Sequence, residues 1–241
     1  MKKYGHAIVV GASSGLGAEI ARQLAATGCR VAAVARRAER LESLARESAN
    51  ITIYPHDATD YASVPLLFQR IAQEIGGLDL VVFAAGVMPE VAVGEYDFEK
   101  DRQIVEVNVL GAVAWLNEAA LRFQSTGHGT IVGIGSVAGD RGRMKQPVYN
   151  ASKAFLHTYL EALRNRVARH GVTVVTIKPG PMDTEMTAGM HLRSAMSAEE
   201  AARRTLARAE TGGEKYLSAK HRLAFAVIKR IPSWIFRRLN V

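Results

Sequence analysis

The sequence has a single cysteine, Cys29, which excludes an internal disulfide. It also lacks any run of 18 or more apolar residues, so we do not expect an ordinary membrane-spanning helix. The first five residues lead straight into an apolar segment, and we therefore expect no cleavable signal and a cytoplasmic protein. With 241 residues, of which 48% are hydrophobic, the chain can bury a large core, and the spacing of its apolar runs favours one domain.

Residues 215–241 contain no aspartate or glutamate, whereas the whole chain carries a net charge of +8. The rest of the chain is close to neutral, so the basic character belongs to this terminal segment. Segments of this kind can contact anionic membrane surfaces or nucleic acids. The seven cations of the segment are Lys215, Lys220, Arg222, Lys229, Arg230, Arg237 and Arg238.

Strand-like apolar runs alternate with helix-like segments, which predicts an α/β fold with a doubly wound parallel sheet. The predicted strands are residues 6–10, 30–35, 50–55, 78–84, 130–136 and 172–178, with a short last strand near 215–217. The predicted helices are residues 15–27, 37–48, 61–75, 95–124 with a possible break, 147–170 and 198–209. We expect a catalytic domain over residues 1–218 and a basic amphipathic tail over residues 219–241.

A glycine-rich turn lies between the first predicted strand and the first predicted helix, with the spacing G-x-x-x-G-x-G. Glycines permit a tight turn and close backbone approach, and the helix N-terminus offers free N–H groups to a pyrophosphate. The arrangement predicts a Rossmann-type dinucleotide-binding fold; an ordinary glycine-rich turn is the alternative. The predicted phosphate-binding residues are Gly11, Ser13, Ser14, Gly15, Leu16 and Gly17.

Two arginines, Arg36 and Arg37, follow the second predicted strand. NAD-binding folds usually have an acidic residue here to hold the ribose 2′-hydroxyl, but this chain has Ala35. An arginine fork suits a 2′-phosphate through charge-assisted hydrogen bonds, so we predict NADP(H) rather than NAD(H). The alternative is that both arginines are solvated at a helix start, as nearby Arg40 is expected to be.

Tyr149 and Lys153 lie four residues apart in a predicted helix, and therefore on one face of it. A cation beside a phenol favours the phenolate and lowers the tyrosine pKa, which suits proton transfer to or from a substrate oxygen. Ser136 ends an apolar run thirteen residues upstream of Tyr149. With a hydride carrier, these residues predict carbonyl–alcohol chemistry.

Together these motifs resemble the short-chain dehydrogenase/reductase family, in its short single-domain subtype, from about His6 to Leu217. Asn108, Ser136, Tyr149 and Lys153 match the family's catalytic tetrad. The resemblance implies that Tyr149 is the general acid or base, Lys153 holds the nicotinamide ribose and lowers the tyrosine pKa, and Ser136 binds the substrate oxygen. It implies that Asn108 orders a water that connects Lys153 to solvent.

The resemblance also assigns cofactor contacts. Asp57 and Ala58 match the family's adenine-contacting pair, and Ala84, Ala85 and Gly86 fall in its N-N-A-G segment with both asparagines replaced. The remaining cofactor contacts that it implies are Tyr149, Lys153, Pro179, Gly180 and Thr184. Segment 182–195, with Gly189 and the three methionines Met182, Met186 and Met190, occupies the place of the family's substrate lid; a plain surface loop is the alternative.

These observations favour an NADP(H)-dependent oxidoreductase that acts on an apolar carbonyl or secondary alcohol. The alternative is a non-catalytic NADP(H)-binding sensor or scaffold, which would not need the complete serine, tyrosine and lysine set. Taken singly, each of these side chains could have an ordinary structural role. We predict no metal site, because His128, His157, His170 and His191 lack ligand spacing.

The terminal segment repeats apolar residues every four positions, with basic residues beside them and Pro232 as a helix breaker. We expect two short helices that either dock on the body or a second subunit, or lie on a membrane surface. No recognisable nucleic-acid-binding motif accompanies them, so we expect no nucleic acid partner. By resemblance we expect a homodimer or homotetramer formed through the helices near 95–124 and 147–170. The repeating apolar residues are Leu223, Val227, Ile231, Ile235 and Leu239.

Overall fold

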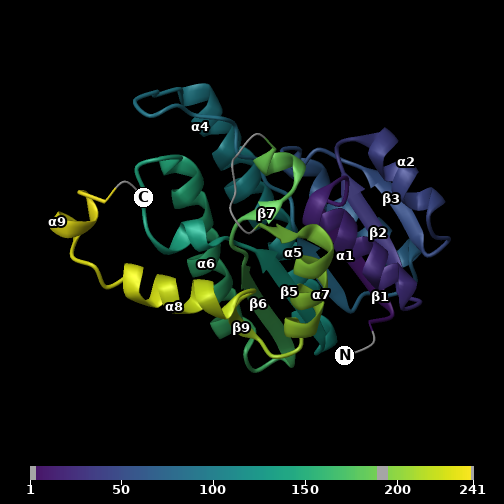
Figure 1. Cartoon of the computed structure of the whole chain (residues 1–241). Helices are drawn as coiled ribbons and strands as arrows, with labels where there is room; N and C mark the ends of the chain where they lie inside the picture. The colour runs from purple at the N-terminus through teal and green to yellow at the C-terminus, as the bar shows by residue number, and fades with distance from the viewer. Residues whose placement is uncertain (1–3, 189–194, 240–241) are drawn as a thin grey trace.

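The computed structural model describes residues 4–188 and 195–239. Seven parallel strands form one sheet in the order β3-β2-β1-β4-β5-β6-β9 (Figure 1). The order reverses between β1 and β4, so the predicted doubly wound, Rossmann-type sheet is confirmed. The strands are β1 His6–Val10, β2 Arg30–Ala35, β3 Ile51–Pro55, β4 Leu80–Phe83, β5 Gly129–Ile134, β6 Val172–Lys178 and β9 Gly213–Tyr216.

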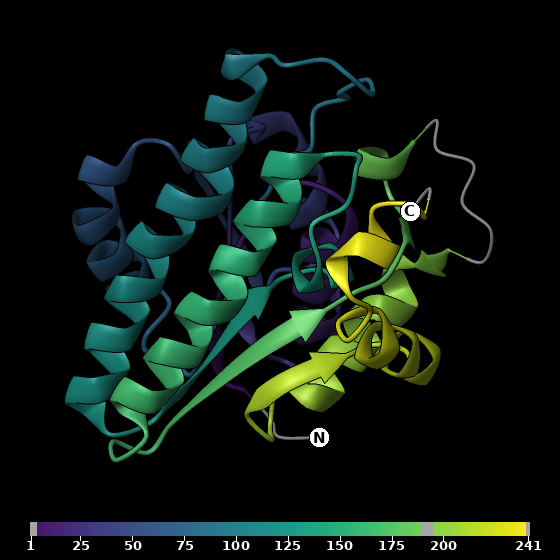
Figure 2. The ribbon, with the colours of Figure 1, turned by 90° about the vertical axis from the view of Figure 1, so that its left-hand side faces the viewer.

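Helices cover both faces of the sheet, which explains why the central strands β1 and β4 are apolar at almost every position. In β1, Ala7 and Val9 face one hydrophobic core, whereas Ile8 and Val10 face the other. The first core lies under α1 Gly15–Ala26, α2 Ala38–Arg46 and α7 Ala198–Arg208 (Figure 1). The second lies under α3 Val64–Glu74, α5 Ala112–Thr126 and α6 Pro147–Val167 (Figure 2).

The predicted long helix with a break spans Phe98–Thr126 and consists of three parts. α4 Phe98–Val105 starts at Asp97, whose carboxylate accepts hydrogen bonds from the N–H groups of the first turn. A π-helical segment, Glu106–Gly111, then joins α4 to α5 and accounts for the break. By length and composition this helix could cross a membrane, but half of its most apolar window is buried. Trp115 and Phe123 are fully buried against the sheet, as in a core helix.

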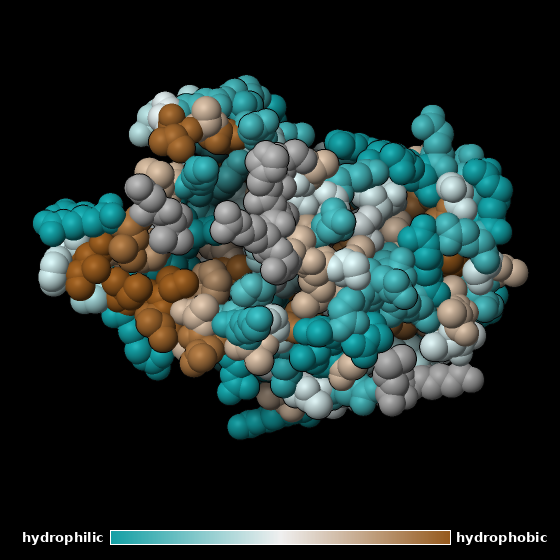
Figure 3. All heavy atoms as spheres, viewed as in Figure 1, coloured by the Kyte–Doolittle hydropathy of each residue, from teal (hydrophilic) through white to brown (hydrophobic). Residues whose placement is uncertain are grey.

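The terminal segment forms α8 Ala219–Ile228 and α9 Ser233–Phe236, separated at Pro232 as predicted. Phe225 and Phe236 are buried, so the segment is docked on the body of its own chain. The opposite side of the segment is apolar and exposed, and Figure 3 shows these side chains gathered at one end of the molecule.

The segment after β6 contains structure that the sequence did not predict. β7 Met182–Asp183 pairs with β8 Met196–Ser197 in a short two-stranded ladder. A 3-10 turn, Glu185–Thr187, follows β7. The predicted lid residues Gly189 and Met190, together with His191, lie outside the described residues.

Candidate active site

The glycine turn brings three backbone segments into contact. Gly11 has a φ of +92°, and a Cβ there would lie 2.6 Å from the Ala85 Cα. A Cβ on Gly17 would overlap the Gly11 carbonyl group. Any side chain at either position would therefore force apart the turn, α1 and the loop after β4. The glycines are required by the close approach that a phosphate cradle needs.

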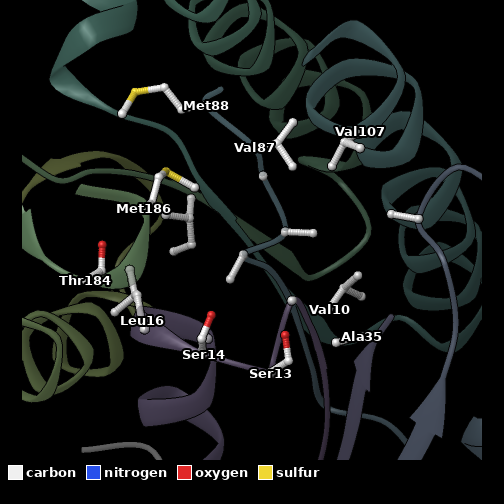
Figure 4. A pocket seen from close by; sticks show the side chains of 18 of the residues that line it. Val10, Ser13, Ser14, Leu16, Ala35, Val87, Met88, Val107, Thr184 and Met186 are labelled. Carbon is white, nitrogen blue, oxygen red and sulfur yellow. The ribbon is translucent and has the colours of Figure 1, made fainter. Parts of the chain in front are cut away.

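A cavity of about 550 Å³ opens at the carboxyl edge of the sheet, beside this turn (Figure 4). It runs from the glycine turn to α6, so residues far apart in the sequence share one pocket. Sixteen of the predicted site residues line it: Gly11, Ser13, Ser14, Gly15, Leu16, Gly17, Arg36, Arg37, Asp57, Ala58, Ala84, Ala85, Gly86, Tyr149, Lys153 and Thr184.

Four predicted residues, Asn108, Ser136, Pro179 and Gly180, are not part of the pocket lining. Ser136, Pro179 and Gly180 lie at the same sheet edge, where the Val137 N–H, next to Ser136, donates to the Pro179 carbonyl over 2.9 Å. Asn108 lies in the π-helical segment instead. The pocket also has an apolar wall, of which the sequence indicated only the methionine of the predicted lid segment, since isolated apolar residues carry no motif. This wall includes Val87, Met88, Val107 and Met186, all visible in Figure 4.

Arg36 and Arg37 both border the pocket but have different partners. The Arg37 guanidinium donates to the Ser13 and Ser14 hydroxyls over 3.0 and 2.5 Å, and to Glu185 over 2.9 Å. The Arg36 guanidinium lies 3.6 Å from the Asp57 carboxylate and is more exposed. Arg37 stands at the start of α2 and its side chain is 42% exposed, as the alternative of solvated arginines expects, but its guanidinium also ties the glycine turn to the segment after β6.

Tyr149 and Lys153 are both buried on α6, with the Lys153 Nζ 5.7 Å from the centre of the tyrosine ring. Nζ donates to the Ile134 carbonyl over 3.1 Å. Ser136 begins the 3-10 turn Val137–Asp140, and its Oγ accepts a hydrogen bond from the Ala138 N–H. The expected serine, tyrosine and lysine set is thus brought together where β5 meets α6.

The electrostatics of this set differ from the expectation. Burial raises the pKa of Tyr149, although a hydrogen bond with Ser136 and the charge of Arg143 act in the opposite direction. Burial also lowers the pKa of Lys153 to about 8. The prediction that Lys153 depresses the tyrosine pKa is therefore wrong for this structure. Removal from water is the largest cause of both pKa shifts.

Asn108 lies in the π-helical segment and is buried. Its Oδ1 accepts from the Val87 N–H over 2.8 Å, and its Nδ2 donates to the Val87 carbonyl and to the Ser152 hydroxyl. A Cβ on Gly86 would lie 3.3 Å from Asn108 Oδ1 and 3.4 Å from Lys153 Nζ. Asn108 therefore fastens the loop after β4 to α6, directly behind Lys153.

The comparisons with known proteins agree with this geometry. The family model for short chain dehydrogenases matches residues 5–194. A protein of Myxococcus xanthus strain DK1622, described as an uncharacterized oxidoreductase, is 40% identical over 77% of this chain and 75% of its own length. One of Staphylococcus aureus strain MW2, with the same description, is 32% identical over 76% of this chain and 80% of its own length.

Among solved structures, a short chain dehydrogenase from Burkholderia cenocepacia J2315 in complex with NADP is similar over the full length of both chains. The TM-score is 0.86 and the sequence identity 28%. A short chain dehydrogenase/reductase family protein has a TM-score of 0.80 with 30% identity, covering 90% of this chain and 97% of its own. The chain belongs to the short-chain dehydrogenase family, and it is an oxidoreductase of the dehydrogenase/reductase type.

The buried ammonium of Lys153 predicts a pH-dependent stability. Its pKa is about 8 in the folded protein against an ordinary value of 10.5, so the unfolded chain binds more protons between these values. The free energy of unfolding should therefore rise with pH in this window. Relative to Lys153→Met, the wild type should gain about 1–2 kcal/mol between about pH 8 and pH 9.5 in urea denaturation. If the difference in the free energy of unfolding between wild type and Lys153→Met did not change with pH, the lowered pKa of Lys153 would be contradicted.

Proposed function

We propose that the protein is an NADP(H)-dependent oxidoreductase that transfers hydride between the nicotinamide and a carbonyl or secondary alcohol. The observation that carries the proposal is one pocket that joins the glycine turn and Arg37 to Tyr149 and Lys153. The close approach at Gly11 and Gly17 fits a pyrophosphate. The NADP in the similar Burkholderia structure supports the same cofactor for this chain.

The bound nicotinamide supplies or accepts the hydride, while the protein supplies orientation and proton transfer. Tyr149 gives its hydroxyl proton to the substrate oxygen in reduction and removes it in oxidation. Ser136 donates to the same oxygen. Lys153, with a pKa of about 8, binds the nicotinamide ribose and restores the Tyr149 proton. Asn108 keeps the loop after β4 in place and orders the water that connects Lys153 to solvent.

An apolar substrate fits the pocket best. The wall formed by Val87, Met88, Val107 and Met186 offers no charge and few hydrogen bonds to a ligand. Methionine side chains adapt to irregular apolar shapes, and two of the four are methionines. We therefore propose that the substrate carries a hydrophobic group next to the reacting carbonyl or carbinol.

The arginines give a test of cofactor choice. Arg37→Ala and Arg36→Ala should each raise the dissociation constant for NADPH at least about tenfold, because a charge-assisted bond to the 2′-phosphate is lost. Binding of NADH, which lacks that phosphate, should change less than about threefold. The measurement is nicotinamide fluorescence during titration.

Arg40→Ala is the matched control for this titration, since Arg40 also pairs with Glu185 but does not line the pocket. Tighter binding of NADH than of NADPH by the wild type would overturn the choice of NADP(H). Tight NADPH binding without turnover of any ketone or aldehyde would favour the sensor or scaffold alternative.

Tyr149→Phe tests the assignment of the general acid. Removing only the hydroxyl should lower the turnover number at least about 100-fold, the usual scale of acid–base catalysis, and leave NADPH affinity nearly unchanged. Tyr54→Phe is the control, because it also removes a hydrogen-bonded phenol, there paired with Glu74. The measurement is NADPH oxidation with a panel of apolar ketones; near-normal rates for Tyr149→Phe would refute the assignment.

We also propose that the protein forms a homodimer or homotetramer through the outer faces of α5 and α6 and the π-helical segment before α5. Leu110, Leu121 and Phe155 are 45%, 66% and 40% exposed on these segments, and Phe155 stacks on Tyr159. Large apolar side chains gathered on neighbouring helices are typical of subunit contacts. A second copy of the chain would bury these side chains, so no other kind of partner is needed to cover them.

A further part of the proposed function concerns the tail: we propose that the protein is cytoplasmic and attaches to anionic membrane surfaces through it. Leu223, Val227 and Trp234 are 71%, 59% and 59% exposed. Figure 3 shows exposed apolar side chains gathered at the end of the molecule where the tail lies. Exposed basic residues flank them and no acidic residue occurs in the segment, which complements a negative surface.

Sedimentation with vesicles tests this attachment. The wild type should bind vesicles of phosphatidylglycerol and phosphatidylcholine but not pure phosphatidylcholine. The double variant Leu223→Glu, Val227→Glu should bind at least about tenfold more weakly, because two apolar contacts are lost and negative charge is added. The control is Leu66→Glu, Val93→Glu, with nearly the same exposed fractions elsewhere, 76% and 60%. Failure of the wild type to sediment would end the proposal.

A further inference from the structure

The docked tail is fastened to the segment that carries Ser136. Arg141, directly after the 3-10 turn Val137–Asp140, donates to the carbonyls of Ile228, Lys229 and Ile231 over 3.2, 3.1 and 2.8 Å. These carbonyls lie at and just beyond the end of α8, where helical N–H partners run out; the Ile228 carbonyl also accepts from the Ile231 N–H over 3.3 Å. The same guanidinium lies 4.4 Å from the ring centre of Phe236 in α9. One arginine therefore holds both helices of the tail.

Asp140, the residue before Arg141, makes a second connection. Its carboxylate is almost fully buried and accepts from Lys178 Nζ over 2.8 Å and from the Tyr216 hydroxyl over 2.5 Å. The ammonium of Lys229, in the tail, lies 3.2 Å from the same carboxylate. Asp140 thus joins β6, β9 and the tail at one point. A buried carboxylate needs hydrogen-bond and ion-pair donors, so moving Asp140 away from these partners would cost free energy.

The connection reaches Ser136 through a buried histidine. His157 Nδ1 lies 3.8 Å from Asp140, and its Nε2 faces the Ser136 N–H over 3.4 Å. Burial lowers the pKa of His157 to about 3, so the ring is neutral. Because His157 Nε2 accepts the hydrogen bond from the Ser136 N–H, the proton of the neutral ring is on Nδ1, which faces Asp140.

The tail also covers the turn after β6. On Gly180, a Cβ would lie 2.9 Å from His221 Nε2 and closer still to other atoms of that ring. His221 lies on α8, so the glycine permits the tail to pack directly on the Pro179–Gly180 turn. The tail therefore contacts two of the loops that end at the pocket edge, those that follow β5 and β6.

We propose that the docked tail positions the Ser136 segment for the reaction, with Asp140 and Arg141 as positioning residues. This inference rests on the proposed function. The 3-10 turn packs closely on α6, where a Cβ on Gly139 would lie 2.6 Å from the Lys153 carbonyl carbon. Its last residue and Arg141 are also bound by the tail, β6 and β9. Releasing the tail removes the contacts of Lys229 and of the tail carbonyls from the end of this turn, and small displacements of a group that binds the reacting oxygen are costly.

The experiment compares Arg141→Met with Arg222→Met, which removes an exposed arginine from the same tail. Lys229→Met is a second variant that removes only the tail's ion pair with Asp140. Arg141→Lys keeps a cation and several donors. Hydrogen exchange is followed in peptides covering residues 135–141 and 219–231. Affinity for NADPH and the turnover number with phenanthrenequinone, a planar apolar diketone, are measured for each full-length protein.

We expect Arg141→Met to speed exchange in both peptides and to lower the turnover number about tenfold, while NADPH affinity changes less than about twofold. Lys229→Met should act in the same direction, Arg141→Lys should recover most of the rate, and Arg222→Met should match the wild type. Three results for Arg141→Met would each overturn the proposal. They are faster exchange in the tail peptide alone, wild-type exchange in the tail peptide, and a wild-type turnover number despite faster exchange in the tail peptide.

The exchange result does not depend on catalysis. If the wild type binds no NADPH, the proposed function fails, and the peptide at 135–141 still shows whether the tail orders the turn. The wild type could bind NADPH and still leave phenanthrenequinone unreduced. In that case, slower exchange of the peptide 135–141 in the wild type than in Arg141→Met supports the positioning role. Equal exchange in the two proteins refutes it.

Discussion

The contact between backbones at Gly11, Gly17 and Ala85 is the constraint on which the site depends. It lets the glycine turn, the start of α1 and the loop after β4 meet without any side chain between them. The strand order places this contact where β1 and β4 run side by side and their crossovers diverge. The strand order opens a crevice between β1 and β4, and the contact at the glycines leaves backbone without side chains at the bottom of that crevice. The pocket follows from both.

Burial explains how the remaining groups of the site behave. α6 brings Tyr149 and Lys153 under the end of β5, where water is excluded and the uncharged form of each is favoured. Asn108 lies in the π-helical segment, and its amide bonds inward to Val87 and Ser152. The interruption of the helix therefore coincides with the residue that holds the loop after β4, as is frequent at functional sites.

The sequence predicted the parts that depend on local chemistry. Alternating apolar runs gave all seven strands of the main sheet to within a few residues, and the glycine, tyrosine and lysine motifs located the pocket. The apolar wall at Val87 and Val107 and the short ladder at β7 carry no local signal. The tyrosine pKa was wrongly predicted because sequence spacing gives the neighbouring charge but not the depth of burial.

The contacts of the tail could not be predicted from the sequence. Its periodicity allowed both a docked helix and a membrane-surface helix, and the structure shows that docking uses only one side. The docked side depends on Arg141, Asp140 and Gly180, none of which stands near the tail in the sequence. Contacts of this kind join segments that local patterns cannot relate. They leave the opposite, apolar side of α8 and α9 exposed, so one short segment has a side docked near the pocket and a side open to other contacts.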